Sequence, residues 1–128
     1  MADITTTMEP QALVDGYFRC WNATSEPDRI TATRATWSED ARNVDPLTDA
    51  TGHDELVAMF AGFQASYPGH SFRQRGGLDA HHGLLRWSWE MVDADGNVTL
   101  DGIDVAVLAE DGRIASLGGF FGADVPDD

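Results

Sequence analysis

The spacing of apolar residues changes once along this chain, from a helical pattern in its first half to an alternating pattern in its second. Apolar side chains recurring every three or four residues predict helices over residues 8–22, 28–36 and 53–67. The third helix has the clearest stripe, formed by Leu56, Met59, Phe60, Phe63 and Tyr67. Pro68 and Gly69 then end it.

From residue 71 onwards the pattern is extended, with turn-forming residues between the segments. Strands are predicted over Ser71–Ala80, Gly83–Asp93, Asn97–Ala109 and Arg113–Phe121. An earlier strand, Trp37–Pro46, is predicted to end at its proline, and residues 47–52 are predicted to form a loop. Helices followed by hairpin-linked strands indicate an α+β domain with antiparallel pairing.

Alternation along the strands predicts which faces are covered. Leu85, Trp87, Trp89 and Met91 share one face of their strand. In the strand 97–109 both faces are largely apolar, so one can pack on the helices while the other needs a different cover. We therefore expect a homodimer that forms through the sheet.

Length and charge narrow the functional classes. The 128 residues suit one domain, with a core over about residues 8–122. With 8 basic against 22 acidic residues, the net charge is −14, which disfavours binding to nucleic acid or to an anionic membrane surface. The first residues do not resemble a signal peptide, and no apolar run is long enough to span a bilayer, so we expect a cytoplasmic protein.

The cysteine and histidine content gives no metal site. Cys20 is the only cysteine, which excludes an internal disulfide and a cysteine-based zinc site. His81 and His82 are adjacent in a predicted strand, where their side chains point to opposite faces and cannot easily share one ion. We expect no metal and no cofactor, although His82 could line a pocket as an acid or base.

Three polar residues occur where an apolar pocket would tolerate them poorly. Asp104 interrupts the apolar run 103–108, and a carboxylate there is costly unless it is paired, hydrogen-bonded or protonated. Tyr17 lies in an apolar helical stretch, and Asp45 precedes Pro46 at a strand end. Each also has a structural explanation: a core tyrosine, a turn-opening aspartate and a buried structural acid.

Several local signatures resemble one known family. They are Trp37-Ser-Glu-Asp-Ala41, Val44-Asp45-Pro46, Gly52-His53, Gly102-Ile-Asp-Val105, Glu110-Asp-Gly-Arg-Ile114 and Gly119-Phe-Phe-Gly122. Together with the element order, they resemble the SnoaL-like branch of the nuclear transport factor 2-like superfamily, related to polyketide cyclases and ketosteroid isomerases. The resemblance covers about residues 8–122. It implies a cone in which three N-terminal helices pack on a curved, mostly antiparallel sheet around a pocket.

The resemblance to ketosteroid isomerases extends to individual residues. Tyr17 precedes Asn22 by five residues, Asp45 precedes a proline, and Asp104 follows Ile103, as do the catalytic groups of that family. This implies that Asp45 acts as a general base and that Tyr17 and a protonated Asp104 donate hydrogen bonds to an oxyanion. The substrate would be a small apolar, carbonyl-bearing molecule.

The remaining pocket residues are predicted from their side-chain types. The expected lining consists of Trp37, Asn43, Phe60, Phe63, His82, Trp87, Trp89 and Phe121. Taken one at a time, the aromatic residues could equally form the packed core. Two other functions stay open: a non-catalytic small-molecule binding protein, and a limonene-type epoxide hydrolase. Asn43 favours the hydrolase, whose acid-arginine-acid arrangement is not found in the sequence.

Overall fold

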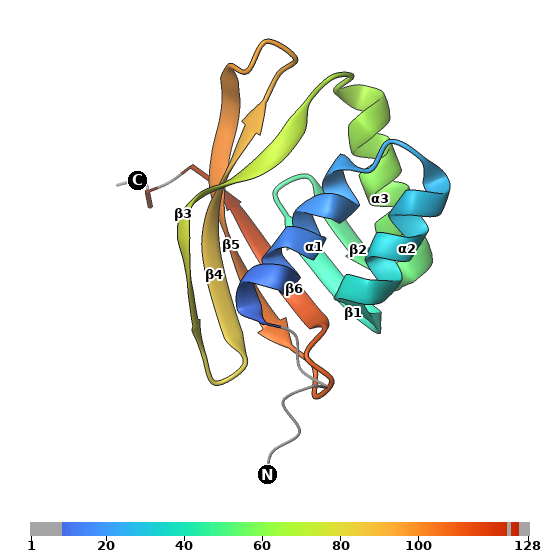
Figure 1. Cartoon of the computed structure of the whole chain (residues 1–128), viewed down its shortest axis with the longest axis vertical. Coiled ribbons are helices and arrows are strands. Elements are labelled where there is room, and N and C mark those ends of the chain that lie inside the picture. Colours follow the sequence, from blue (N-terminus) through green and yellow to red (C-terminus); the bar gives the residue numbers. More distant parts are fainter. Residues whose placement is uncertain (1–8, 123, 126–128) are drawn as a thin grey trace.

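Helices cover one face of a curved sheet in the computed structural model, which describes residues 9–122, 124 and 125 (Figure 1). The helices of this part are α1 (Pro10–Asn22), α2 (Glu26–Thr36) and α3 (His53–Ser66). The strands are β1 (Trp37–Asp45), β2 (Thr48–Thr51), β3 (Ser71–His81), β4 (Leu84–Val92), β5 (Val98–Leu108) and β6 (Ile114–Phe121). The predicted α+β class, with three helices packed on a mostly antiparallel sheet, is confirmed.

The strands form one sheet in the order β2-β1-β6-β5-β4-β3. All neighbours are antiparallel except β1 and β6, which run parallel. In that pair Val44 lies opposite Gly118, and in the next pair Gly118 lies opposite Val105. The parallel contact therefore brings the end of β1 beside the middle of β5, although about 60 residues separate them in sequence.

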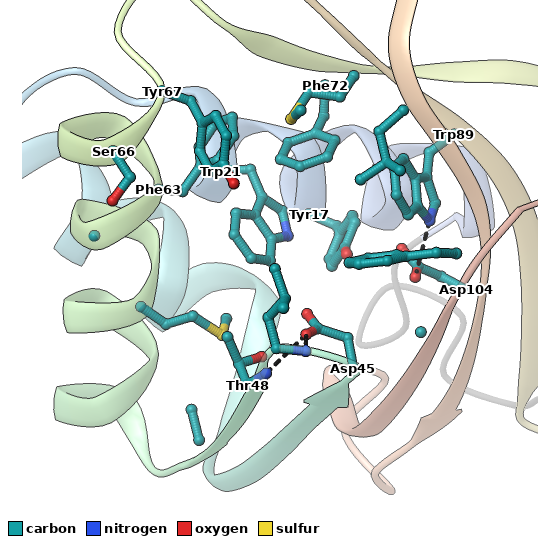
Figure 2. A pocket seen from close by; sticks show the side chains of 18 of the residues that line it. Tyr17, Trp21, Asp45, Thr48, Phe63, Ser66, Tyr67, Phe72, Trp89 and Asp104 are labelled. Atoms are coloured by element: carbon teal, nitrogen blue, oxygen red, sulfur yellow. Dashed lines mark hydrogen bonds between the residues drawn. The ribbon is translucent and has the colours of Figure 1, made fainter.

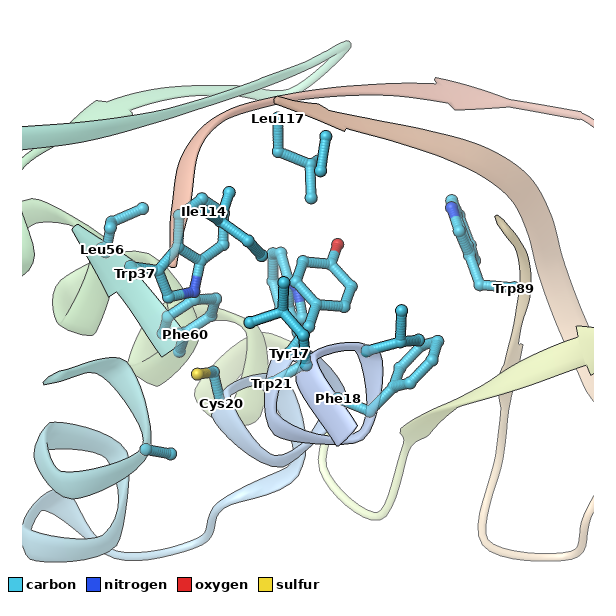
Figure 3. Close-up of a cluster of buried hydrophobic side chains, with 14 of the residues drawn as sticks. Tyr17, Phe18, Cys20, Trp21, Trp37, Leu56, Phe60, Trp89, Ile114 and Leu117 are labelled. Carbon is cyan, nitrogen blue, oxygen red and sulfur yellow. The ribbon is translucent and has the colours of Figure 1, made fainter. Parts of the chain in front are cut away.

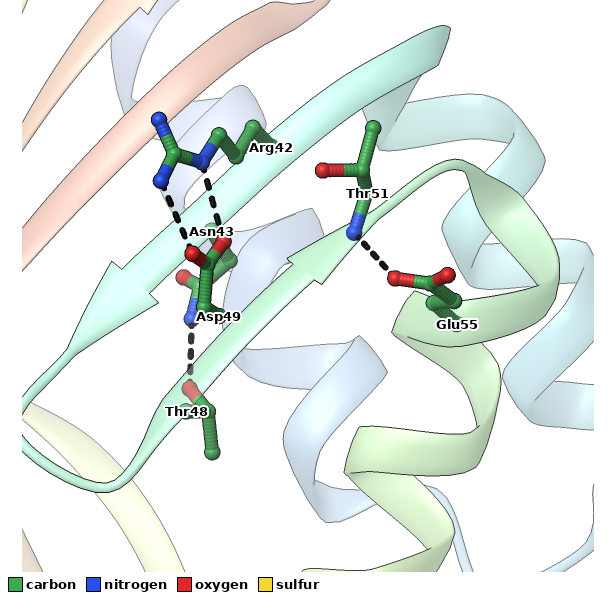
Figure 4. Close-up of polar contacts among 6 residues, drawn as sticks. All are labelled: Arg42, Asn43, Thr48, Asp49, Thr51 and Glu55. Carbon is green, nitrogen blue, oxygen red and sulfur yellow. Dashed lines mark hydrogen bonds and ion pairs between the residues drawn. The ribbon is translucent and has the colours of Figure 1, made fainter.

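The predicted loop over residues 47–52 was wrong, because Thr48–Thr51 forms strand β2, which pairs with β1. Its outer side is held by Arg42, which donates from Nε and Nη2 to the Asp49 carboxylate at 2.9 and 2.8 Å (Figure 4). Glu55 accepts from the backbone N–H of Thr51 at 2.8 Å. These polar contacts stabilise a strand in which only Ala50 is buried, so the apolar pattern did not reveal it.

The helix boundaries follow capping chemistry. Helix α1 begins at Pro10, a favourable residue for a first turn, and the predicted start at residue 8 lies outside the described residues. Helix α2 begins at Glu26, two residues before the prediction, because Ser25 caps it by accepting from the Asp28 N–H at 3.3 Å. Helix α3 ends at Ser66, so Tyr67 lies just beyond it.

The predicted inner face of β4 is confirmed. Leu85, Trp87, Trp89 and Met91 are all buried under the helices. On β5 the inward residues Gly102, Asp104 and Ala106 are buried, whereas Val105 and Val107 on the other face are 39% and 44% exposed. The sheet thus has a covered inner face and an open, partly apolar outer face.

The core fills the narrow end between α1, α2, α3 and the sheet (Figure 3). Its most buried large side chains include Leu13, Trp37, Leu56, Phe60 and Ile114. Cys20 is also fully buried there, and burial raises the pKa of its thiol to about 11. Cys20 is therefore a packing residue.

Candidate functional site

A cavity of about 630 Å³ opens between α1, α3, the β1–β2 hairpin and the inner face of the sheet (Figure 2). Most of its wall is apolar, with aromatic rings from several elements: Tyr17, Phe18, Trp21, Phe63, Tyr67, Phe72, Trp89 and Phe121. Many of these rings pack edge to face, for example Trp21 on Phe72 and Phe72 on Trp89, with centroids 5.2 and 5.3 Å apart. Such packing gives a preformed cavity large enough for a small ring compound.

Asp104 lies on the inner face of β5 and is only 3% exposed. The indole Nε1–H of Trp89 donates to its Oδ1 at 3.2 Å. Within the described residues its Oδ2 is buried and has no hydrogen-bond partner. Burial raises the pKa of Asp104 to about 7, opposed by interactions with Tyr17 and Trp89 and assisted by the Asp45 charge. A protonated Asp104 carboxyl would therefore be a hydrogen-bond donor at the cavity wall.

Tyr17 projects from α1 toward Asp104 (Figure 2) and is 5% exposed. Its ring packs edge-on against Phe18 and Trp87, with centroids 5.4 and 5.1 Å away. Burial raises the pKa of its hydroxyl well above 10, and the neighbouring Asp104 adds to the rise. Tyr17 therefore stays protonated and supplies a second donor beside Asp104.

Asp45 ends β1 at the mouth of the same cavity. Its Oδ1 accepts from the backbone N–H groups of Leu47 and Thr48, both at 2.9 Å. Its Oδ2 has a longer contact, 3.5 Å, with the side-chain amide of Asn43. One oxygen thus holds the turn into β2, and the other remains available to a ligand.

The structure brings only some of the predicted residues to this cavity. Tyr17, Asp45, Asp104, Phe63, Trp89 and Phe121 line it. Trp37, Phe60 and Trp87 lie instead in the packed core, because they sit toward the narrow end where the helices meet the sheet. His82 lies in the exposed turn between β3 and β4, with a positive φ of 48°.

Asn43 lies behind the cavity wall instead of on it. It is 1% exposed, and its Nδ2 contacts Asp45, Thr48 and Met59 at 3.5, 3.2 and 3.4 Å. Its role is to position the β1–β2 turn.

Other lining residues were not predicted as part of a site. Trp21, Thr48, Met59, Tyr67, Phe72 and Leu100 all line the cavity. Met59 and Tyr67 belonged to the recognised apolar stripe, but a stripe does not separate residues that face the core from those that face a cavity. Phe72 could have been found from its position at the start of β3, opposite Met91.

Two findings concern ions and membranes. Across residues 9–122, 124 and 125, no group of three or more His, Cys, Asp and Glu side chains is arranged to hold a metal ion. None of the helices in this part of the chain is long and apolar enough to cross a membrane.

The sequence from residue 14 to residue 117 matches the model of the SnoaL-like domain. This match spans most of the chain. The protein belongs to the SnoaL-like family. No protein with a curated description matched the sequence.

Solved structures agree with membership of the SnoaL-like family. A family member from Agrobacterium tumefaciens str. C58 that carries an isomerase assignment superposes with a TM-score of 0.85 at 30% identity, over 88% of this chain and 97% of that one. An NTF2-like protein of unknown function from Exiguobacterium sp. 255-15 gives a TM-score of 0.65 at 23% identity, over 88% and 99%. A protein from Sinorhizobium meliloti with a polyketide cyclase assignment gives 0.66 at 13% identity, over 84% and 93%. Because the last two structures share so little sequence identity with this chain, they show only that the fold is shared.

Proposed function

We propose that the protein is a cofactor-independent enzyme that transfers a proton next to the carbonyl group of a small apolar compound, as an isomerase or a cyclase does. One observation carries the proposal: Asp104 is 3% exposed, has a pKa of about 7, and shares a cavity with Asp45 and Tyr17. A buried, protonated carboxyl beside a second donor suits an oxyanion. The isomerase assignment of the Agrobacterium relative supports the same chemistry.

In this mechanism Asp45 Oδ2 removes a proton from the carbon next to the carbonyl. The electron pair of the broken C–H bond moves into the carbonyl and forms an enolate. The Tyr17 hydroxyl and the protonated carboxyl of Asp104 donate hydrogen bonds to the enolate oxygen. In an isomerisation Asp45 then returns the proton to a different carbon. In a ring closure the enolate carbon attacks a second carbonyl carbon, the C=O π bond there breaks to give an alkoxide, and the alkoxide takes the proton from Asp45.

A second function is favoured by the turn at Asp45. Because Asp45 Oδ1 accepts from Leu47 and Thr48, the residue has a structural role that needs no catalysis. In a non-catalytic binding protein, Tyr17 and Asp104 would hold the ligand oxygen and Asp45 would only shape the mouth. An epoxide hydrolase receives no such support, since no arginine is among the residues that line the cavity.

Hydrogen–deuterium exchange separates the two functions. A ring ketone such as tetralone is incubated in heavy water, and exchange at the carbon next to the carbonyl is followed by NMR. Asp45→Asn keeps the turn acceptor and removes the base, so it should slow exchange by about 100-fold or more. Asp40→Asn, on the same strand but exposed, is the matched control and should keep the wild-type rate. Exchange that the wild type catalyses and Asp45→Asn leaves unchanged would remove Asp45 from the role of base. Exchange that the wild type does not catalyse, despite binding the ketone, would favour the binding protein.

A further inference from the structure

The ionisable side chains that line the cavity are all acidic. They are Tyr17, Asp45, Asp49, Glu55, Tyr67 and Asp104, and no arginine, lysine or histidine is among the lining residues. Asp104 is the most deeply placed, with a buried Oδ2 that has no partner among the described residues. The cavity therefore has two uncharged donors at its base and carboxylates toward its mouth.

Five of the eight arginines pair with acidic side chains. All eight basic residues are arginines. Arg42 donates to both carboxylate oxygens of Asp49, so this lining acid already has a counter-ion (Figure 4). Four further arginines pair with acids outside the cavity: Arg73 with Glu90, Arg75 with Asp101, Arg86 with Asp79 and Arg113 with Asp111. Within residues 9–122, no basic side chain is left facing the cavity to balance Asp45.

The binding free energy of an anionic ligand would therefore include two unfavourable contributions. Its charge would leave water for an apolar, ring-lined cavity without a counter-ion. It would also lie near the Asp45 charge, in a chain whose net charge is −14. Neither contribution applies to a neutral ligand. A protonated amine would be attracted by the Asp45 carboxylate and by the faces of the aromatic rings in the wall.

We infer that the cavity selects its ligand by charge: it takes ring compounds that carry no acid group and rejects their carboxylates. This deepens the proposed function and rests on it only in assuming that the cavity binds a ligand. If the natural compound is made as a carboxylic acid, a reaction that removes or masks the carboxyl group must come first.

Two isosteric probes test the inference by calorimetry near neutral pH. Naphthamide and naphthoate have the same shape and differ by one negative charge. We expect naphthamide to bind at least about 100-fold more tightly, from a like-charge repulsion at close range in a partly buried site. Naphthylmethylamine, which carries a positive charge, should bind no more weakly than naphthamide. Naphthoate that binds as tightly as naphthamide would overturn the inference.

A pair of variants shows whether Asp45 supplies the discrimination. Asp45→Asn should reduce the ratio of naphthamide to naphthoate affinity by about tenfold or more. Asp40→Asn removes the same charge from an exposed position on the same strand and should leave the ratio unchanged. An unchanged ratio in Asp45→Asn would contradict the inference, and near-UV circular dichroism verifies that the variant is folded.

The outcomes remain separate from those of the proposed reaction. If naphthamide binds and naphthoate does not, charge selection stands even when no ketone exchanges its protons. If both probes bind equally, charge selection fails while the exchange experiment can still succeed. If none of the three probes binds, the cavity is not a site for such ring compounds, and both proposals fail.

Discussion

Asp45 and Asp104 are held on either side of one backbone position, Gly119. A β-carbon at residue 119 would lie 2.9 Å from Asp104 Oδ1 and 3.2 Å from Asp45 Cβ. The two carboxyl groups come from strands that do not pair with each other, and β6 runs between them. The missing side chain at Gly119 leaves both groups free to face the same cavity.

Substitution of Gly119 tests this arrangement. Gly119→Ala should displace the Asp104 carboxyl from Trp89 or close the space beside Asp45, and cost about 1–3 kcal/mol of stability. Proton exchange and naphthamide affinity should each fall by about tenfold or more. Gly77→Ala is the control, because a β-carbon there would meet nothing within 4 Å and the residue does not line the cavity. Equal behaviour of the two variants in calorimetry and thermal unfolding would show that the space at residue 119 is not needed.

The buried carboxyl of Asp104 should make stability depend on pH. Its pKa is raised from 3.8 to about 7 in the folded state, so between these values the folded protein binds more protons than the unfolded chain. Stability should therefore fall as the pH rises from about 4 to about 7, by up to about 4 kcal/mol in total.

Asp104→Asn removes this titration. The free energy of unfolding of the variant, measured with urea at about pH 5 and about pH 8, should change less between the two values than that of the wild type. In the wild type, turnover should also decline above about pH 7, as Asp104 loses the proton it donates. Parallel stability curves for the two proteins would contradict the neutral, buried state of Asp104.

The hydrogen bond from Trp89 predicts a shift in the titration of Asp104. Trp89 donates to Oδ1 and so stabilises the ionised carboxyl, which means that Trp89→Phe should raise the pKa of Asp104 further above its usual range. The buried acceptor left without its donor should also cost about 1–3 kcal/mol.

Trp87→Phe provides the control for this variant. Trp87 is equally buried on the same strand, and among the described residues its Nε1 has no hydrogen-bond partner. Carboxyl-carbon NMR should show the titration of Asp104 moved upward in Trp89→Phe and unmoved in Trp87→Phe. A common shift would assign the effect to packing instead of the hydrogen bond.

Sequence patterns were most informative where burial alternates. The alternation Leu85, Trp87, Trp89, Met91 correctly assigned the inner face of β4, and the apolar run around Asp104 correctly indicated a buried acid. The same alternation did not show which inward residues lie in the packed core and which line the cavity. Trp87 and Trp89 share a face and both pack in the core cluster, yet only Trp89 also lines the cavity.

Sequence patterns also did not predict the pairing of strands that are far apart in the chain. Strand β2 has a single buried residue, and its stability comes from pairing with β1 and from Arg42–Asp49. The parallel contact of β1 with β6 joins segments far apart in sequence, which periodicity does not report. That contact places Asp45 near Gly119, so the shared cavity could be expected from family resemblance but not from local pattern.

The outer face of the sheet predicts a homodimer. A row of residues in register crosses it, with Val44 opposite Gly118 and Gly118 opposite Val105. Val105, Val107 and Phe120 are 39%, 44% and 64% exposed there. Ion pairs such as Arg73–Glu90 and Arg86–Asp79 neutralise charge around this row. In a chain with a net charge of −14, a second copy can approach this face with the least repulsion.

Light scattering after gel filtration checks the dimer. The wild type should give twice the chain mass of 13.9 kDa, and Val105→Glu should give a monomer, because burying an unpaired charge at the centre of the face opposes association. Thr99→Glu adds the same charge on the outward side of β5 but near its start, and should leave the dimer intact. A wild-type monomer at tens of micromolar would contradict the prediction. Because the cavity opens on the opposite face of the sheet, Val105→Glu should keep the naphthamide affinity of the wild type if the monomer remains folded.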